Sequence, residues 1–188
     1  MNGGLQMAKV YVFLSPGFEE VEAVGVVDIL RRANVEVDMV SIGDTLEVTS
    51  TRNVTIRADI MFNQIQAEVD MLVLPGGIPG APNLSLHEGL ASLILTYNNM
   101  DKYLAAICAA PTVYGKMGLL KGKNATCYPG HEADLHGANI VLEEVVVDGK
   151  FITSRGMGTT IPFALKLVEV LVSAEEAKRI KDAILYGN

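Results

Sequence analysis

The stretch YLAAICAAPTVYGKM, residues 103–117, contains the change of pattern that decides the fold. Its first part is a short continuous apolar run, which is typical of a strand buried on both faces. Its second part carries Pro111 in what would be the first turn of a helix, where proline is tolerated. The stretch therefore predicts a strand from Tyr103 to Cys108 that is followed directly by a helix from Ala109 to Met117.

The same alternation of strand and helix extends in both directions along the chain. Apolar runs predict further strands, and longer segments with apolar residues at helical spacing predict helices. The expected strands cover 9–14, 35–42 and 70–74, and the expected helices cover 19–33, 85–99, 159–172 and 174–186. Short β pieces are expected within 43–59, and Asp148-Gly149 predicts a hairpin within 145–153.

This order of elements predicts an α/β fold with a mostly parallel central sheet and helices on both faces. We find no internal repeat, linker or low-complexity stretch. The sequence therefore predicts a single domain over residues 7–188, with residues 1–6 as a short N-terminal extension.

Composition excludes several classes of protein. The chain of 188 residues is 49 % apolar, has a net charge of −7 and contains no Trp. Because a protein that binds the phosphate backbone needs positive charge, specific nucleic-acid binding is not expected. Two cysteines do not make a disulfide scaffold, and the three histidines show no metal-ligand spacing, so we expect no metal.

No membrane span or export signal is predicted from the sequence. No run reaches the roughly 18–20 apolar residues that a membrane span requires. The apolar run from Val10 to Leu14 is too short for the core of a signal peptide, and Glu19 and Glu20 soon follow it. We therefore expect a cytoplasmic protein that does not contact membranes.

Three unusual segments follow expected strands, where ligands bind in open α/β sheets: 15–22, 75–80 and 107–111. Cys108 lies where a strand ends and a helix begins, and backbone N–H groups at a helix start lower a thiol pKa. That position indicates a reactive thiol. A buried structural cysteine is the alternative, since free Cys is among the most buried residue types.

Glu22 is the candidate acid/base, one turn into the first expected helix. The alternative is a solvated charge that favours the helix N-terminus, which is our interpretation for Glu19 and Glu20. Because a carboxylate and a thiolate repel each other, the two groups work together only if one of them holds a proton. A protonated Glu22 that donates to a Cys108 thiolate would meet this condition.

Other residues near these segments are weaker candidates. Gly76 and Gly77 offer backbone N–H groups for an oxyanion, although a plain strand-to-loop turn explains them equally well. They form neither nucleotide-binding fingerprint, so no cofactor is expected. The remaining candidates are side chains that could support the cysteine or hold an anion: Tyr128, His131, Arg32 and Arg52. His87 and His136 are expected at the surface.

These motifs, taken in order, resemble those of the ThiJ/PfpI superfamily and most closely its DJ-one, Parkinson-associated clade. The likeness begins at Met7 and covers nearly the whole chain. It rests on 17–22, 27–33, 74–77, 105–112 and 153–159. The resemblance implies a flavodoxin-like three-layer sandwich, usually dimeric, with Cys108 as nucleophile and Glu22 as its protonated partner. The backbone at Gly76, Gly77 and Ala109 would line an oxyanion site.

The resemblance also implies a cofactor-independent enzyme of glyoxalase III or deglycase type, which acts on 2-oxoaldehydes or their adducts. The alternative is an oxidative-stress sensor or chaperone with an oxidisable cysteine. An amidotransferase-like hydrolase would need His131 as its histidine. Family peptidases place a His directly after the cysteine, where this chain has Ala109, so a peptidase is disfavoured. The human-type member has a His where this chain has Tyr128, which argues against a cysteine–histidine dyad.

Overall fold

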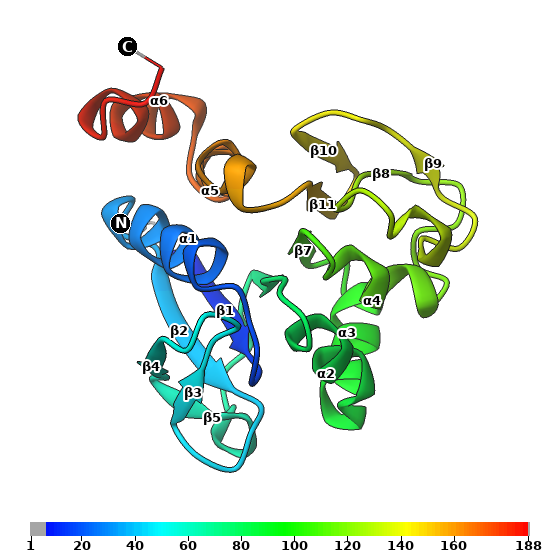
Figure 1. Cartoon of the computed structure of the whole chain (residues 1–188). Helices are drawn as coiled ribbons and strands as arrows, with labels where there is room; N and C mark the ends of the chain where they lie inside the picture. The colour runs from blue at the N-terminus through cyan, green and yellow to red at the C-terminus, as the bar shows by residue number, and fades with distance from the viewer. Residues whose placement is uncertain (1–6, 188) are drawn as a thin grey trace.

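A seven-stranded sheet forms the centre of the computed structural model, which describes residues 7–187 (Figure 1). The strand order is β10-β11-β7-β6-β1-β2-β5. The strands are β1 (Lys9–Leu14), β2 (Glu36–Ser41), β5 (Ile60–Met61), β6 (Met71–Leu74), β7 (Tyr103–Ile107), β10 (Val145–Asp148) and β11 (Phe151–Ser154). Neighbours pair in parallel except β10, which is antiparallel to β11. The predicted mostly parallel sheet and the hairpin at Asp148-Gly149 are confirmed.

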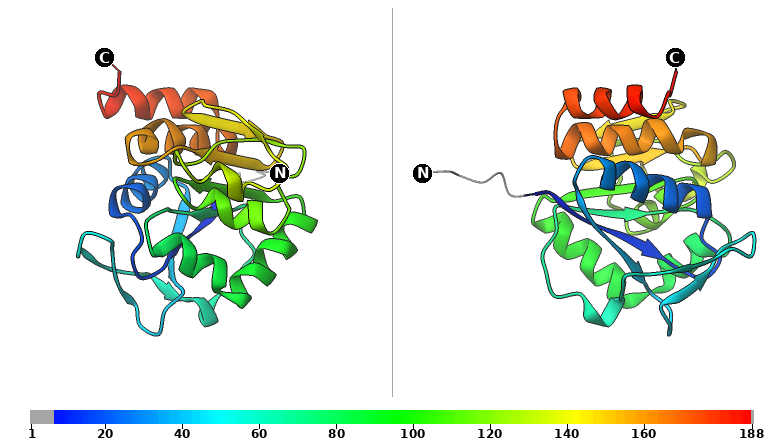
Figure 2. Two further views of the ribbon diagram at one scale, coloured as in Figure 1. Left: turned by 45° about the vertical axis from the view of Figure 1, so that its right-hand side comes forward. Right: turned by 90° about the vertical axis from the view of Figure 1, so that its left-hand side faces the viewer.

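Helices cover both faces of the sheet and make a flavodoxin-like three-layer sandwich (Figure 2). One layer contains α1 (Glu20–Arg32), α5 (Thr160–Leu171) and α6 (Ala174–Ala183), and the other contains α2 (Gly80–Leu86), α3 (Glu88–Asn99) and α4 (Pro111–Lys116). Strand β1 shows why two cores form. Val10 and Val12 pack toward α1 and α5, whereas Tyr11 and Phe13 pack toward α2, α3 and α4. Successive side chains of a strand point to opposite faces, so an unbroken apolar run supplies both cores.

The helix expected over 85–99 is instead two helices, and this boundary prediction was wrong. His87 separates them, because its Nδ1 accepts a hydrogen bond from the Leu90 N–H and caps α3. Its ring also lies 4.5 Å from that of Phe62, centroid to centroid. His87 is thus half-buried and structural rather than a surface residue, while His136 is exposed as expected.

Shorter elements bring loops to the end of the sheet. The hairpin of β3 (Glu47–Thr49) and β4 (Thr55–Arg57) matches the β pieces expected within 43–59. Its tip is fastened to the loop after β1, since the Thr51 N–H donates to the Phe18 carbonyl. The two-residue strands β8 (Asn124–Ala125) and β9 (Asn139–Ile140) and three 3-10 turns, η1 (Phe62–Gln64), η2 (Glu132–Asp134) and η3 (Met157–Thr159), were not predicted.

The predicted extension over residues 1–6 lies outside the described residues, and the division at residue 7 stays a prediction. Between residues 7 and 187, the helices are either too short or too polar to traverse a bilayer.

Candidate active site

A cavity of about 390 Å³ opens where β1, β6 and β7 end. Since parallel strands share one carboxyl edge, the loops that follow these three strands meet there, as the sequence predicts. The residues lining the cavity come from these loops, from the hairpin tip and from the segments around 128 and 157: Glu19, Glu22, Thr51, Arg52, Gly77, Ile78, Cys108, Ala109, Tyr128, His131 and Met157.

Cys108 occupies a sharp turn between β7 and α4. Its φ is 66°, a left-handed conformation that is uncommon outside glycine and costs on the order of 1–3 kcal/mol. Two backbone hydrogen bonds hold the turn: the Cys108 N–H donates to Ser154 O, and the Tyr128 N–H donates to Cys108 O. The side chain is half-buried and lines the cavity. Strain held in place by the surrounding backbone is typical of functional sites.

Glu22 is fully buried on the first turn of α1. Its backbone N–H is capped by Glu19 Oε2 at 2.7 Å, and its own Oε2 accepts the Gly76 N–H at 2.8 Å. Within residues 7–187, Glu22 Oε1 has no protein hydrogen-bond partner. Burial raises the pKa of Glu22 to about 7, against smaller lowering contributions from the Gly76 N–H and from the neighbouring Cys108 thiol. The carboxyl is therefore poised to gain or lose a proton near neutral pH.

The thiol of Cys108 does not have the lowered pKa that its position predicts. Burial and then the negative charge of Glu22 raise the pKa of Cys108 to about 12, and the N–H groups of Ala109 and Gly77 offset this only in part. The prediction from the helix start was wrong because it left out burial and the neighbouring carboxylate. Once Glu22 takes up a proton its charge disappears, and its O–H can donate to the sulfur.

The glycine turn after β6 passes close to Cys108 and Glu22. A Cβ at Gly76 would lie 2.5 Å from Cys108 Cβ and 2.8 Å from Glu22 Oε2, so no larger residue fits there. Gly77 has a φ of 98° and packs against the backbone before α1. Gly77 and Ala109 line the cavity beside Cys108, and their N–H groups lower its thiol pKa in part. The Gly76 N–H binds Glu22 instead and is not available to an oxyanion, contrary to expectation.

Tyr128 and His131 both line the cavity. Their rings meet edge to face, 6.3 Å apart between centroids. Gly156 places Tyr128 near the thiol, since a Cβ there would lie 3.2 Å from Tyr128 Cδ2 and 4.0 Å from Cys108 Sγ. Neither side chain hydrogen-bonds to Cys108 within the part of the chain that the structure describes.

The two candidate arginines lie in different parts of the structure. Arg52 lines the cavity from the hairpin tip and makes long hydrogen bonds to Thr51 O and Oγ1, at 3.5 and 3.4 Å. Arg32 lies at the opposite end of α1 from Glu22, where it pairs with Asp28 at 2.7 Å. Arg32 is thus not part of this site.

Several residues that line the cavity were not predicted from the sequence. Thr51, Ile78 and Met157 come from loops whose positions no periodic pattern predicts. Glu19 was interpreted as a solvated charge, yet it both caps α1 and lines the cavity. Across residues 7–187, no group of three His, Cys, Asp or Glu side chains is arranged to bind a metal ion.

Comparison with known proteins identifies relatives of this architecture. The model of the DJ-1/PfpI family matches residues 8–170. Protein DJ-1 homolog B of Arabidopsis thaliana is 37 % identical over 179 residues, which are 94 % of this chain and 41 % of that protein. The chain thus spans about two fifths of the length of that relative. The Schizosaccharomyces pombe protein named glutathione-independent glyoxalase DJ-1 is 29 % identical, with 90 % and 94 % of the two chains covered.

Solved structures agree with the sequence comparison. A structure described as Toxoplasma gondii DJ-1, oxidized, superposes with a TM-score of 0.93 at 37 % identity. The match covers 96 % of this chain and all of that one. The Drosophila melanogaster DJ-1beta structure gives a TM-score of 0.92 at 34 % identity, with 97 % and 100 % covered.

Proposed function

Because this chain belongs to the DJ-1/PfpI family, we propose that it is a cofactor-independent cysteine enzyme that converts 2-oxoaldehydes or their adducts into 2-hydroxy acids. The observation that carries the proposal is that the buried Glu22 carboxyl and the Cys108 thiol both face the cavity side by side, since a Cβ at Gly76 would lie 2.8 Å from Glu22 Oε2 and 3.0 Å from Cys108 Sγ. The S. pombe relative named as a glutathione-independent glyoxalase supports the choice of substrate class.

The first step is addition of the thiol to the aldehyde carbon. The sulfur forms a bond to that carbon, the S–H proton passes to the Glu22 carboxylate, and Glu22 returns it to the oxyanion, which gives a hemithioacetal and restores the carboxylate. A carboxyl with a pKa of about 7 suits this exchange, because both of its protonation states are populated near neutral pH. The N–H groups of Gly77 and Ala109 lie on the sulfur side of the cavity and can stabilise the transient oxyanion.

The second step moves hydrogen between the two substrate carbons. Glu22 removes the proton from the former aldehyde carbon, which gives an enediol, and a proton is returned to the neighbouring carbon. The result is a thioester of a 2-hydroxy acid. Water then adds to the thioester carbonyl, releases the acid and regenerates the thiol, with no net oxidation. A deglycase would use the same two residues on an adduct already formed on another molecule.

The test is lactate formation from methylglyoxal without glutathione. We expect Cys108→Ala and Glu22→Gln to lower turnover by at least about 100-fold. Cys127→Ala is the matched control, since Cys127 is buried on the other side of the sheet and should leave turnover unchanged. Absence of turnover in the unmodified protein, or full turnover in Cys108→Ala, would contradict the proposal.

A redox sensor is the second candidate function. The related T. gondii structure is described as oxidized, so a similar protein has been observed in that state. Here Cys108 is accessible from the cavity whereas Cys127 is 3 % exposed. Mild peroxide should therefore oxidise Cys108 first. Mass spectrometry that finds Cys127 oxidised and Cys108 intact would refute a sensor role.

We also propose that the chain forms a homodimer through the face beside the cavity mouth. Val21 and Val24 of α1 and Met157 and Ile161 around the start of α5 are exposed there, between 37 and 56 %. The two helices touch, since a Cβ on Gly25 would lie 2.7 Å from Thr160 Cγ2. Neighbouring exposed apolar side chains of this kind favour a protein interface.

Sedimentation velocity tests this dimer. Val24→Glu should shift the protein toward the monomer, because a charge at the centre of an apolar interface would be buried without a partner. Leu86→Glu is the control, since Leu86 is 79 % exposed on α2 in the opposite helix layer. A monomeric unmodified protein, or equal dimerisation of both variants, would exclude this interface.

A further inference from the structure

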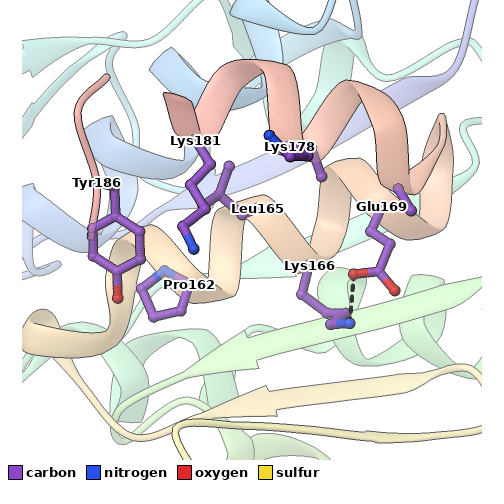
Figure 3. A pocket seen from close by; sticks show the side chains of 9 residues that line it. Pro162, Leu165, Lys166, Glu169, Lys178, Lys181 and Tyr186 are labelled. Carbon is purple, nitrogen blue, oxygen red and sulfur yellow. Dashed lines mark hydrogen bonds and ion pairs between the residues drawn. The ribbon is translucent and has the colours of Figure 1, made fainter. Parts of the chain in front are cut away.

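A second cavity, of about 440 Å³, lies between α5 and α6, on helices that supply none of the predicted site residues (Figure 3). Its floor is apolar: Leu165 and Ala177 each keep only 8 % exposure. Pro162 and the ring of Tyr186 line one end, where Figure 3 shows them beside Lys181. A volume within about 300–1,000 Å³ and a mainly apolar lining are the properties of small-molecule sites.

Lysine side chains line the rim of this cavity. The lining contains three lysines, Lys166, Lys178 and Lys181, and a single acidic residue, Glu169. The lining therefore has an excess of positive charge in a protein whose net charge is −7. A positively charged rim above an apolar floor is complementary to a ligand that combines an anionic group with an apolar body.

The ion pairs define the charge of that ligand. Lys166 binds Glu169 at 2.6 Å and Lys178 binds Asp182 at 2.6 Å, so two of the three ammonium groups already have an ion-pair partner. Lys181 makes no ion pair with any residue from 7 to 187. Its Nζ lies 6.0 Å from the centroid of the Tyr186 ring, at the outer limit of a cation–π contact. Among the described residues Lys181 is the lining lysine without an ion-pair partner, and one such positive charge matches one negative charge on the ligand.

We propose that the groove between α5 and α6 binds a small monocarboxylate with an apolar aliphatic or aromatic body. The carboxylate pairs with Lys181, and the body lies on Leu165 and Ala177 against the face of Tyr186. A phosphate-rich ligand fits less well, because lysine ammonium groups act as single point charges and no arginine fork lines the groove. A purely apolar ligand would leave the Lys181 charge unused.

Octanoate is the probe for this site, and octanol is its uncharged counterpart. In ¹⁵N-HSQC titrations, octanoate should shift amide signals of α5 and α6, including those of Leu165, Ala177 and Lys181, while octanol should bind about tenfold more weakly or not at all. Because the charges are near the surface, affinity for octanoate should fall as salt is raised from 0.02 to 0.5 M, within roughly the range where screening becomes strong.

Charge variants test whether Lys181 holds the carboxylate. Lys181→Glu should weaken octanoate binding at least about tenfold, since attraction is replaced by repulsion. Lys121→Glu makes the same change of charge at an exposed lysine on the α4 side of the sheet and should bind octanoate normally. Cys108→Ala should also bind normally, because the groove is separate from the cysteine cavity.

Three results would overturn the proposal: equal binding by Lys181→Glu and the unmodified protein, signal shifts confined to the residues of the Cys108 cavity, or no saturable shift below about 10 mM octanoate. Circular dichroism of Lys181→Glu shows whether the variant is folded. If it is unfolded, Tyr186→Ala replaces it, with an expected loss of affinity of at least about threefold from the missing apolar wall.

Discussion

Replacing Glu22 by glutamine should remove most of one specific pH dependence of stability. Burial raises the Glu22 pKa from 4.5 to about 7, so the folded protein binds this proton more tightly than the unfolded chain does. The contribution of Glu22 to the free energy of unfolding is fully present below pH 4.5 and is lost as the pH rises through about 7. At about 1.36 kcal/mol per pKa unit, the loss amounts to about 3 kcal/mol.

Urea unfolding of the unmodified protein and of Glu22→Gln, measured between pH 4.5 and 8, provides the test. Glutamine is neutral at every pH, so the variant should gain about 3 kcal/mol relative to the unmodified protein across this range. Other titrating groups cancel in the difference. Glu143→Gln is the control, because it makes the same substitution at an exposed position. A pH-independent difference for Glu22→Gln as well would refute a raised Glu22 pKa.

Further predictions concern the turns around the site. Gly76→Ala should abolish turnover and destabilise the fold by roughly 1–3 kcal/mol, as measured by urea unfolding and lactate formation, because its Cβ would lie 2.5 Å from Cys108 Cβ. Iodoacetamide at pH 8 should label Cys108 but spare buried Cys127 until the protein is unfolded, and peptide mapping that finds the reverse would contradict the burial. Thr153→Val should lower the midpoint of unfolding by the equivalent of about 1–3 kcal/mol, since it leaves the buried Thr126 N–H without its acceptor, whereas the exposed Thr55→Val should have little effect.

The features predicted best from the sequence are the strands and helices, whose apolar residues follow a repeating pattern. Unbroken apolar runs such as 9–14 indicate strands buried on both faces, and both cores indeed share β1. The sequence predicted that Cys108 and Glu22 would lie at one edge of the sheet because each follows a strand end, and both line the cavity there. The break at His87 was not found, because an imidazole that caps a helix leaves no periodic signal.

Properties that depend on burial could not be predicted in the same way. A helix start predicts a lowered thiol pKa, but burial and the charge of Glu22 outweigh it at Cys108. The positions of loops could not be predicted from the sequence either. Arg52 reaches the cavity because the hairpin tip is hydrogen-bonded to Phe18. Arg32 has the same chemistry but lies at the far end of α1. Sequence alone could not separate these two arginines.

The turn at Cys108 has a consequence for the protein during its synthesis. The Cys108 amide is held by Ser154, on a strand that leaves the ribosome well after Cys108 does. At about 5–20 residues per second, this interval lasts roughly 2–9 s. During that time the thiol lies in an incomplete chain, without the burial and the carboxyl neighbour that later raise its pKa. In a newly made chain Cys108 is therefore an ordinary thiol that oxidants can reach. Oxidation at that stage would take place before the turn that must accommodate the oxidised side chain has formed.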